Sequence, residues 1–241
     1  MNRITTQISL IIMIFFLCLG MLFAQDKGIA RIPPDGVIQT YLVGTKEYAA
    51  LYNGKIETPF DRRQFVNHAF LATDQYMKGV LCYNQVVYQD IYMRLDLFRD
   101  ELTVILPEKP YRVVLEKEKF NYAVLNGYTI ITSIDDKPDQ EEKYRLLIDN
   151  GSHPFVKKYY VTIRNELSNT DVKRHFRFQE QYLIYIDGVV YPVKNKNSLC
   201  KLFPDRKKEL NEYARQHKLD FKAHFEQSVI ALVNHYETFS K

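Results

Sequence analysis

The stretch QYLIYIDGVVYPV, residues 181–193, gives the clearest indication of the fold of this chain. Two apolar, tyrosine-rich runs meet at Asp187-Gly188, and an Asp-Gly pair between such runs is the strongest short-range signal for a tight hairpin. Both faces of this hairpin are apolar, so other parts of the chain have to cover them. Pro192 has no N–H to donate, and we expect its strand to end there or to lie at the edge of a sheet. The stretch therefore predicts an antiparallel sheet that is covered on both sides.

The same turn chemistry recurs along the chain. Beyond residues 1–24, Asx-Gly pairs occur at Asp35-Gly36, Asn53-Gly54, Asn126-Gly127, Asn150-Gly151 and Asp187-Gly188. A type I′ turn needs positive φ at both central residues, so glycine after Asn or Asp is expected where antiparallel strands are joined tightly. Turns therefore account for most glycines and leave few for phosphate-binding loops.

Apolar residues alternate with polar ones between these turns, which is the pattern of half-buried strands. In residues 86–98 we expect Val87, Ile91, Met93, Leu95 and Leu97 to face a core, and Tyr92, Arg94 and Asp96 to face water. Further strands are predicted at residues 80–83, 102–106, 111–115, 122–126, 128–133, 143–149, 159–165 and 174–179.

The pattern becomes helical from Asn197 onward. Asp220 is placed to cap a last helix, whose apolar residues recur every three or four positions and form one stripe. We therefore predict a mainly β (α+β) fold, an antiparallel curved sheet, half-barrel or sandwich with a C-terminal helical pair packed on it. Residues 25–196 would form the β domain and residues 197–241 the helical arm.

Residues 1–24 have the features of a signal peptide. Arg3 provides a positive end, residues 8–19 are apolar apart from Ser9, and Ala24-Gln25 is a plausible cleavage point. Losing Arg3 lowers the formal charge of +4 by one, and no clustered basic face suggests nucleic acid. No second long apolar run occurs, so we expect an exported, periplasmic or outer-envelope protein without a transmembrane segment in the mature chain.

Cys82 and Cys200 remain after such cleavage. In an oxidising compartment they would form one disulfide, or they would be two separate buried thiols. The six histidines show no metal-ligand spacing, and no motif for a cofactor is present, so we predict neither a metal nor a cofactor.

The strongest candidate for a binding loop is NGSHPFVKKYY, residues 150–160. In a functional interpretation, His153, Lys157 and Lys158 contact an anionic or polar ligand and Tyr160 provides a stacking surface. In a structural interpretation, this is a connecting loop whose lysines protect a sheet edge. Ser152 and His153 are neighbours in an extended chain and point to opposite faces, so they cannot form a catalytic couple with each other.

Tyrosine is unusually frequent, with 18 residues and no tryptophan in the chain. Tyrosines on strands build packed ladders or provide rigid, half-polar surfaces for a glycan or peptide. Tyr88 and Tyr92 are four positions apart on one predicted strand. We therefore expect them on one face, as part of any such surface.

Three segments, YMKGVLCYNQVVYQDIYMRLDLFRDEL, LLIDNGSHPFVKKY and KLFPDRKKELNEYARQHKLDFK, resemble a group of uncharacterised exported β-rich proteins of Gram-negative bacteria. The resemblance implies an envelope location and adds no activity. We expect a non-catalytic protein that binds a small ligand or an envelope protein. The alternatives are a hydrolase whose site combines distant residues such as His153 and a carboxylate, and a carrier of lipid-like ligands inside a half-barrel.

Overall fold

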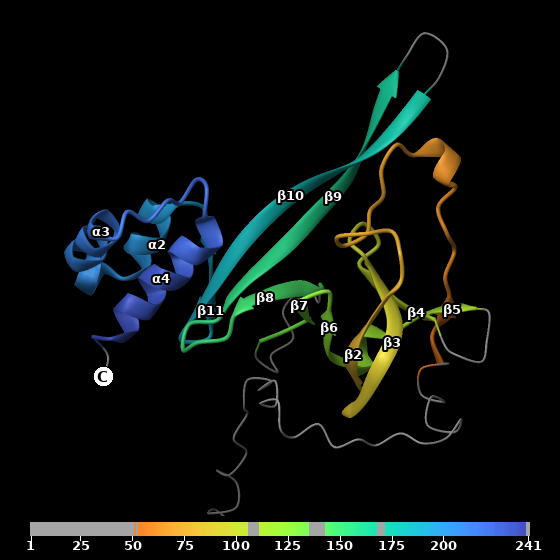
Figure 1. Cartoon of the computed structure of the whole chain (residues 1–241), viewed down its shortest axis with the longest axis horizontal. Coiled ribbons are helices and arrows are strands. Elements are labelled where there is room, and N and C mark those ends of the chain that lie inside the picture. Colours follow the sequence, from red (N-terminus) through yellow and green to blue (C-terminus); the bar gives the residue numbers. More distant parts are fainter. Residues whose placement is uncertain (1–50, 52, 106–110, 135–142, 168–171, 240–241) are drawn as a thin grey trace, which may run out of the picture.

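The computed structural model describes residues 51, 53–105, 111–134, 143–167 and 172–239 (Figure 1). These residues form one 11-stranded antiparallel sheet that is not closed, and three α-helices follow it. The strand order is β1-β5-β4-β3-β2-β6-β7-β8-β9-β10-β11. The predicted mainly β fold with C-terminal helices is therefore confirmed, whereas the predicted signal peptide lies outside the described residues.

The strands are β1 (Lys55–Ile56), β2 (Met77–Tyr83), β3 (Val86–Asp96), β4 (Glu101–Ile105), β5 (Arg112–Val114), β6 (Phe120–Leu125), β7 (Tyr128–Ile131), β8 (Arg145–Asp149), β9 (Phe155–Leu167), β10 (Val172–Ile186) and β11 (Val189–Val193). The helices are α2 (Lys196–Leu202), α3 (Lys207–Gln216) and α4 (Phe225–Glu237), with short 3-10 turns at Arg62–Gln64, Lys117–Lys119 and Pro204–Arg206.

Three hairpins close through two-residue loops in which both residues have positive φ, as type I′ turns require. These loops are Asn84-Gln85, Asn126-Gly127 and Asp187-Gly188. The hairpin predicted from residues 181–193 is thus confirmed, with φ of 51° and 74° at its two loop residues. Asn53-Gly54 and Asn150-Gly151 do not form such turns, because Gly54 and Gly151 lack the positive φ that a type I′ turn needs. Asp35-Gly36 lies outside the described residues.

Strand β3 contains a bulge that the alternating pattern does not reveal. Gly79 pairs with Ile91, but Leu81 pairs with Tyr88, so one extra residue is inserted on β3 and Asp90 has φ of 56°. A bulge reverses which side chains face the core beyond it. The prediction that Val87 shares a face with Ile91 was therefore wrong, since Val87 packs with the cluster on the other face.

A segment before β2 covers the second face of β3. The Leu71 N–H donates to Leu95 O, and the Leu97 N–H donates to Ala69 O. The Arg94 guanidinium lies over the rings of Phe70 and Tyr76, at 3.7 and 4.3 Å from their centres. Arg94 bonds Glu57 at 2.7 Å, and both side chains are buried. The expectation that Arg94 and Asp96 face water was therefore wrong, because a further layer of chain lies over them.

We call strands β1 to β8, with the covering segment 57–76, the body. Its main core contains 18 buried residues, which are Leu51, Leu71 and 16 residues of strands β2 to β8 and their connections. A second cluster on the opposite face joins Tyr122, Ile131, Val156 and Leu183. Both faces of the central strands are therefore covered.

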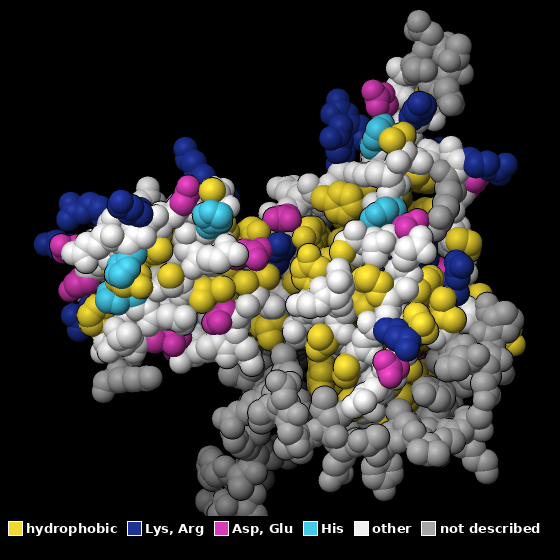
Figure 2. All heavy atoms as spheres, in the orientation of Figure 1, with side chains coloured by type: hydrophobic (Ala, Val, Ile, Leu, Met, Phe, Trp, Pro, Cys, Tyr) yellow, Lys and Arg dark blue, Asp and Glu magenta, His cyan; other side chains and the backbone are white. Residues whose placement is uncertain are grey.

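Strands β9 and β10 pair over 13 residue pairs and extend away from the body as a long two-stranded projection (Figure 1). We call its outer part, residues 159–167 and 172–181, the ribbon. One ribbon face carries Val161, Ile163, Leu167, Val172, Phe176 and Phe178, and the other carries Tyr160, Thr162, Arg164, Lys173, Arg177 and Gln179. Figure 2 shows basic side chains gathered near its far end.

The helices α2 to α4 pack together at one end of the sheet, and we call residues 196–239 the helical unit (Figure 1). Its core includes Leu199, Leu210 and Leu232, and it meets the sheet at Phe155 and Ile184. The predicted contact between helices and sheet is confirmed, although it involves the β10–β11 end only. Within the described residues, every helix is too short or too polar to cross a membrane.

Candidate functional site

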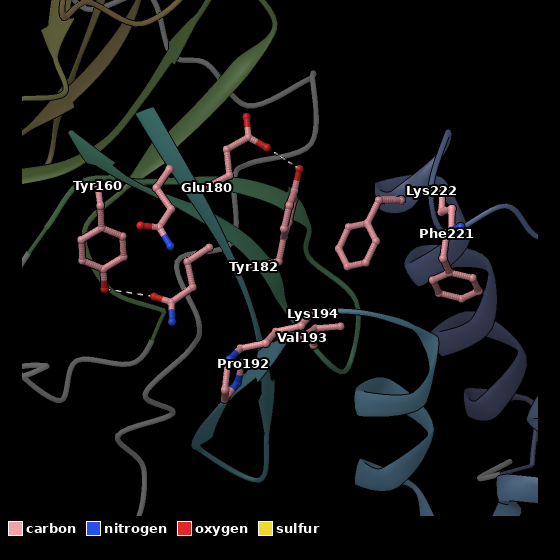
Figure 3. Close-up of a pocket in the computed structure, with 11 residues that line it drawn as sticks. Tyr160, Glu180, Tyr182, Pro192, Val193, Lys194, Phe221 and Lys222 are labelled. Atoms are coloured by element: carbon pink, nitrogen blue, oxygen red, sulfur yellow. Dashed lines mark hydrogen bonds between the residues drawn. The ribbon is translucent and has the colours of Figure 1, made fainter. Parts of the chain in front are cut away.

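A groove of about 920 Å³ opens between the helical unit and strand β10. On the sheet side it is lined by Tyr160 and residues 179–182, and on the helical side by Phe221, Lys222 and Phe225. Pro192, Val193 and Lys194 bound one end of it, as Figure 3 shows. The groove therefore combines strand backbone, aromatic rings and two lysines.

The edge of β10 is open beside this groove. Toward the far end, Val66 N–H donates to Arg174 O at 3.0 Å, and the Asn67 side chain bonds both backbone groups of Phe176 at 2.8 and 2.9 Å. At the near end, β11 pairs with β10 only as far as Tyr182 opposite Val193. The outer edge between these two contacts is unoccupied by any described residue.

Strand alternation determines which backbone groups face this gap. In an antiparallel pair, every second residue directs its N–H and C=O toward the same neighbour. Arg174 and Phe176 direct theirs outward, whereas Tyr185 N–H points the other way and donates to Pro154 O at 2.9 Å. Phe178 and Glu180 share the register of Arg174 and Phe176, so their backbone groups face the gap. Among the described residues, neither has a hydrogen-bond partner there.

A charged network ties the wall of the groove to the sheet. Lys157 Nζ lies 2.5 Å from Glu226 Oε1 at the start of α4 and 3.9 Å from Glu180. The Tyr182 hydroxyl is 2.9 Å from both Glu180 Oε2 and Glu226 Oε1. Burial, with the neighbouring glutamates, raises the pKa of Tyr182. Burial opposes the charge of Lys157, but its bond to Glu226 offsets this and leaves the lysine pKa raised.

His153 forms a second connection, at the other end of α4. Its Nδ1 lies 3.1 Å from Glu237 Oε1, and its ring contacts Phe203 and Tyr236 edge-on at 5.4 and 5.8 Å. Lys157 and His153 thus hold α4 near its two ends. The predicted binding residues His153 and Lys157 are both engaged with the helical unit. The expectation that the lysines protect a sheet edge was wrong, because β9 lies between β8 and β10.

Lys158 and Tyr160 lie on the strand face opposite to Lys157. Lys158 is buried, and its Nζ lies 5.1 Å from the centre of the Tyr160 ring. Tyr160 is partly exposed, lines the groove and donates from its hydroxyl to Gln181 Oε1 at 3.0 Å. Of the four predicted loop residues, only Tyr160 belongs to the groove.

Tyr88 and Tyr92 do not form a shared surface. The β3 bulge lies between them, so Tyr88 is buried in the main core while Tyr92 is exposed and lies beneath Lys78. The prediction that both tyrosines share one face was wrong, because it assumed uninterrupted alternation.

Cys82 and Cys200 are both free and buried. They belong to different clusters, Cys82 to the second cluster, with Tyr122 and Ile131, and Cys200 to the core of the helical unit. Burial raises the pKa of both thiols. The disulfide is therefore not formed, and the alternative of two separate buried thiols describes the structure. In the described part of the chain, no three His, Cys, Asp or Glu side chains are placed to hold a metal ion.

A smaller pocket of about 210 Å³ lies where the covering segment meets the ribbon. Phe60, Phe65, Phe70 and Phe176 line it, and the Phe65 and Phe176 rings stack at 4.5 Å. His68 lines the same pocket and accepts the Phe70 N–H on Nδ1 at 3.3 Å. This hollow is aromatic and has room for one ring-sized group.

Sequence reasoning missed most residues of the groove. Phe221 and Phe225 fit the apolar stripe predicted for the last helix, and no local pattern indicates Lys194, Lys222 or Glu180 as groove residues. The available signal was Pro192, which indicated a sheet edge. Nothing in the local pattern shows that α4 would lie beside that edge.

Comparison of the chain with family models, with curated proteins and with solved structures found no match. The function therefore has to be argued from the geometry of the groove.

Proposed function

We propose that this chain is a non-catalytic exported envelope protein that binds a partner polypeptide as an added strand along the open edge of β10. The observation that carries this proposal is the pair of outward-facing residues, Phe178 and Glu180, whose backbone groups lack partners among the described residues. An exposed row of backbone donors and acceptors is a template for an extended segment. The groove beside it provides room for the side chains of that segment.

The shape of the gap favours a short, flexible segment over a strand that is already part of another sheet. Asn67 closes the gap at Phe176, and Val193 closes it at Tyr182. At about 3.3 Å per residue, the intervening edge admits roughly five residues of extended chain. An edge strand that belongs to a folded sheet of a second copy would collide with Asn67 and Val193 before it could pair with β10.

The two alternative functions find less support in the same geometry. A carrier of lipid-like ligands needs a large apolar cavity, but the 920 Å³ groove has several polar side chains and the aromatic pocket measures only about 210 Å³. A hydrolase could use His153 with Glu237, which the structure does bring together. However, His153 lines neither the groove nor the aromatic pocket, so substrate access to it has no structural support.

Proline at position 180 tests the proposal, because the Glu180 N–H points into the gap. Glu180→Pro should remove one edge donor without breaking the β9–β10 ladder, since proline is tolerated where the N–H faces outward. The probe is a short β-forming peptide of alternating valine and threonine. We expect it to protect the amides of residues 178 and 180 from hydrogen exchange in the wild-type chain and to lose binding to Glu180→Pro.

Two variants separate edge pairing from other effects. Glu180→Ala removes the carboxylate but keeps the N–H, so it should still bind the probe. Gln181→Pro removes an N–H that faces β9 and should disrupt the ribbon itself. Undiminished binding to a folded Glu180→Pro would overturn the proposal. Protection of both amides before the probe is added would also overturn it, because another part of the chain would then occupy the edge.

A further inference from the structure

The charges that line the groove are unbalanced. Lys194 and Lys222 are exposed, and neither forms an ion pair with any described residue. One acid lines the groove, Glu180, which lies 3.9 Å from Lys157, whereas Glu226 lies 2.5 Å from the same lysine. The lining of the groove therefore holds two lysine ammonium groups and one carboxylate beside the open edge.

Both lysines extend from fixed backbone. The Lys194 N–H donates to Ser198 Oγ at 2.9 Å, where the chain leaves β11 and enters α2. The Lys222 N–H donates to Asp220 Oδ1 at 2.8 Å, in the turn that precedes α4. One lysine thus lies at the sheet end of the groove and the other on its helical wall (Figure 3).

We propose that the added segment carries a carboxylate at the position that reaches Lys194 and Lys222. This inference rests on the strand-addition function proposed above and adds the chemical class of the partner to it. Opposite charges across an interface fix the register of a segment as well as contributing affinity. Backbone hydrogen bonds along the edge do not depend on the side chains of the added segment. These lysines would therefore provide part of the selectivity for its sequence.

The carboxylate has two possible sources, an acidic side chain or the free C-terminus of the partner. Valine–threonine peptides that end in Asp-Asp, Asn-Asn or Lys-Lys, all C-terminally amidated, test the side-chain source. The Asn-Asn peptide with a free C-terminus tests the other source. Binding is measured by fluorescence anisotropy at low and at physiological salt.

We expect a peptide with a carboxylate to bind about three- to tenfold more tightly than amidated Asn-Asn, and Lys-Lys to bind most weakly. This preference should shrink as salt increases. The double variant Lys194→Gln/Lys222→Gln should bind the amidated Asn-Asn peptide as the wild type does and lose the preference for the carboxylate. Lys207→Gln/Lys208→Gln, on the exposed surface of α3, is the matched control and should keep it.

The outcomes separate this inference from the proposed function. If all peptides bind equally and Glu180→Pro abolishes their binding, strand addition stands and the carboxylate preference is refuted. If Asp-Asp is preferred and the double glutamine variant keeps that preference, the two lysines are not its cause and the inference fails. If no peptide binds to the wild type, both the proposed function and this inference are refuted.

Discussion

The body and the ribbon belong to one sheet, yet the body buries charged side chains and the ribbon exposes apolar ones. In the body, Arg94 and Asp96 are only 4% and 3% exposed. In the ribbon, Leu167 and Phe178 are 81% and 42% exposed. Residue type alone would have placed these four side chains the other way round.

The number of layers over a strand explains the difference. The covering segment 57–76 lies over β3 and supplies Glu57 to Arg94, so the buried cation is paired. Among the residues that the structure describes, cover on the outer ribbon is local, where Phe60 and Phe65 pack on Phe176. A strand edge and an apolar face that stay uncovered are costly to maintain without a purpose, and this is why the ribbon is the part of the molecule to test for binding.

The largest effect is expected from breaking the buried pair in the body. Glu57→Ala leaves the Arg94 guanidinium buried without its carboxylate, which should lower the free energy of unfolding by about 3–5 kcal/mol. Urea denaturation measures this change.

The matched control is the exposed pair of Lys55 with Glu101, whose lysine side chain is 67% exposed. Lys55→Ala should cost less than about 1 kcal/mol. The double variant Glu57→Ala/Arg94→Met should recover part of the lost stability, since it no longer buries an unpaired charge. If Glu57→Ala costs no more than Lys55→Ala, the covering segment does not seal this part of the body.

Strand β10 contains both a packed and an exposed apolar side chain, so the two environments can be compared within one strand. Ile184 on β10 is 0% exposed and packs against the helical unit, whereas Phe178 lies six residues earlier in the ribbon. Ile184→Ala should lower the free energy of unfolding by about 2–5 kcal/mol, and Phe178→Ala by about 1 kcal/mol or less. Thermal unfolding of both variants checks the contrast. Equal losses would mean that the ribbon is as fully packed in solution as the body.

Features that depend on neighbouring residues were predictable from the sequence. Asp187-Gly188 predicted one hairpin, and Pro192 indicated an edge of the sheet. The apolar stripe of the last helix indicated that this helix packs against the sheet. Each of these depends on the conformational limits or spacing of a few adjacent residues.

Features that depend on distant partners were not predictable. His153 and Lys157 looked available as ligands because Glu237 and Glu226, which engage them, lie far along the chain. The sequence predicts two separate strands where β10 is continuous, because the polar residues 179–181 interrupt the apolar pattern. The β3 bulge at Asp90 has no recognisable signal in the sequence either, because it requires only one residue at positive φ.

The smallest predicted effect concerns alkaline pH and a tyrosine of the body. Burial, with the charge of Asp100, raises the pKa of Tyr144. A folded-state pKa above the unfolded value of about 10 contributes stability that is fully present below pH 10 and is lost as pH rises further. The free energy of unfolding should therefore fall above about pH 10, by about 1 kcal/mol at pH 11 for this group.

Tyr144→Phe isolates this contribution, because phenylalanine keeps the ring that packs edge-on against Phe120 at 5.0 Å. Urea midpoints from pH 8 to pH 11 should decline less steeply in the variant than in the wild type. Parallel declines would show that Tyr144 ionises as easily in the folded chain as in the unfolded one. In that case the main core would be open to water at this position, and the contrast between a sealed body and an exposed ribbon would have to be abandoned there.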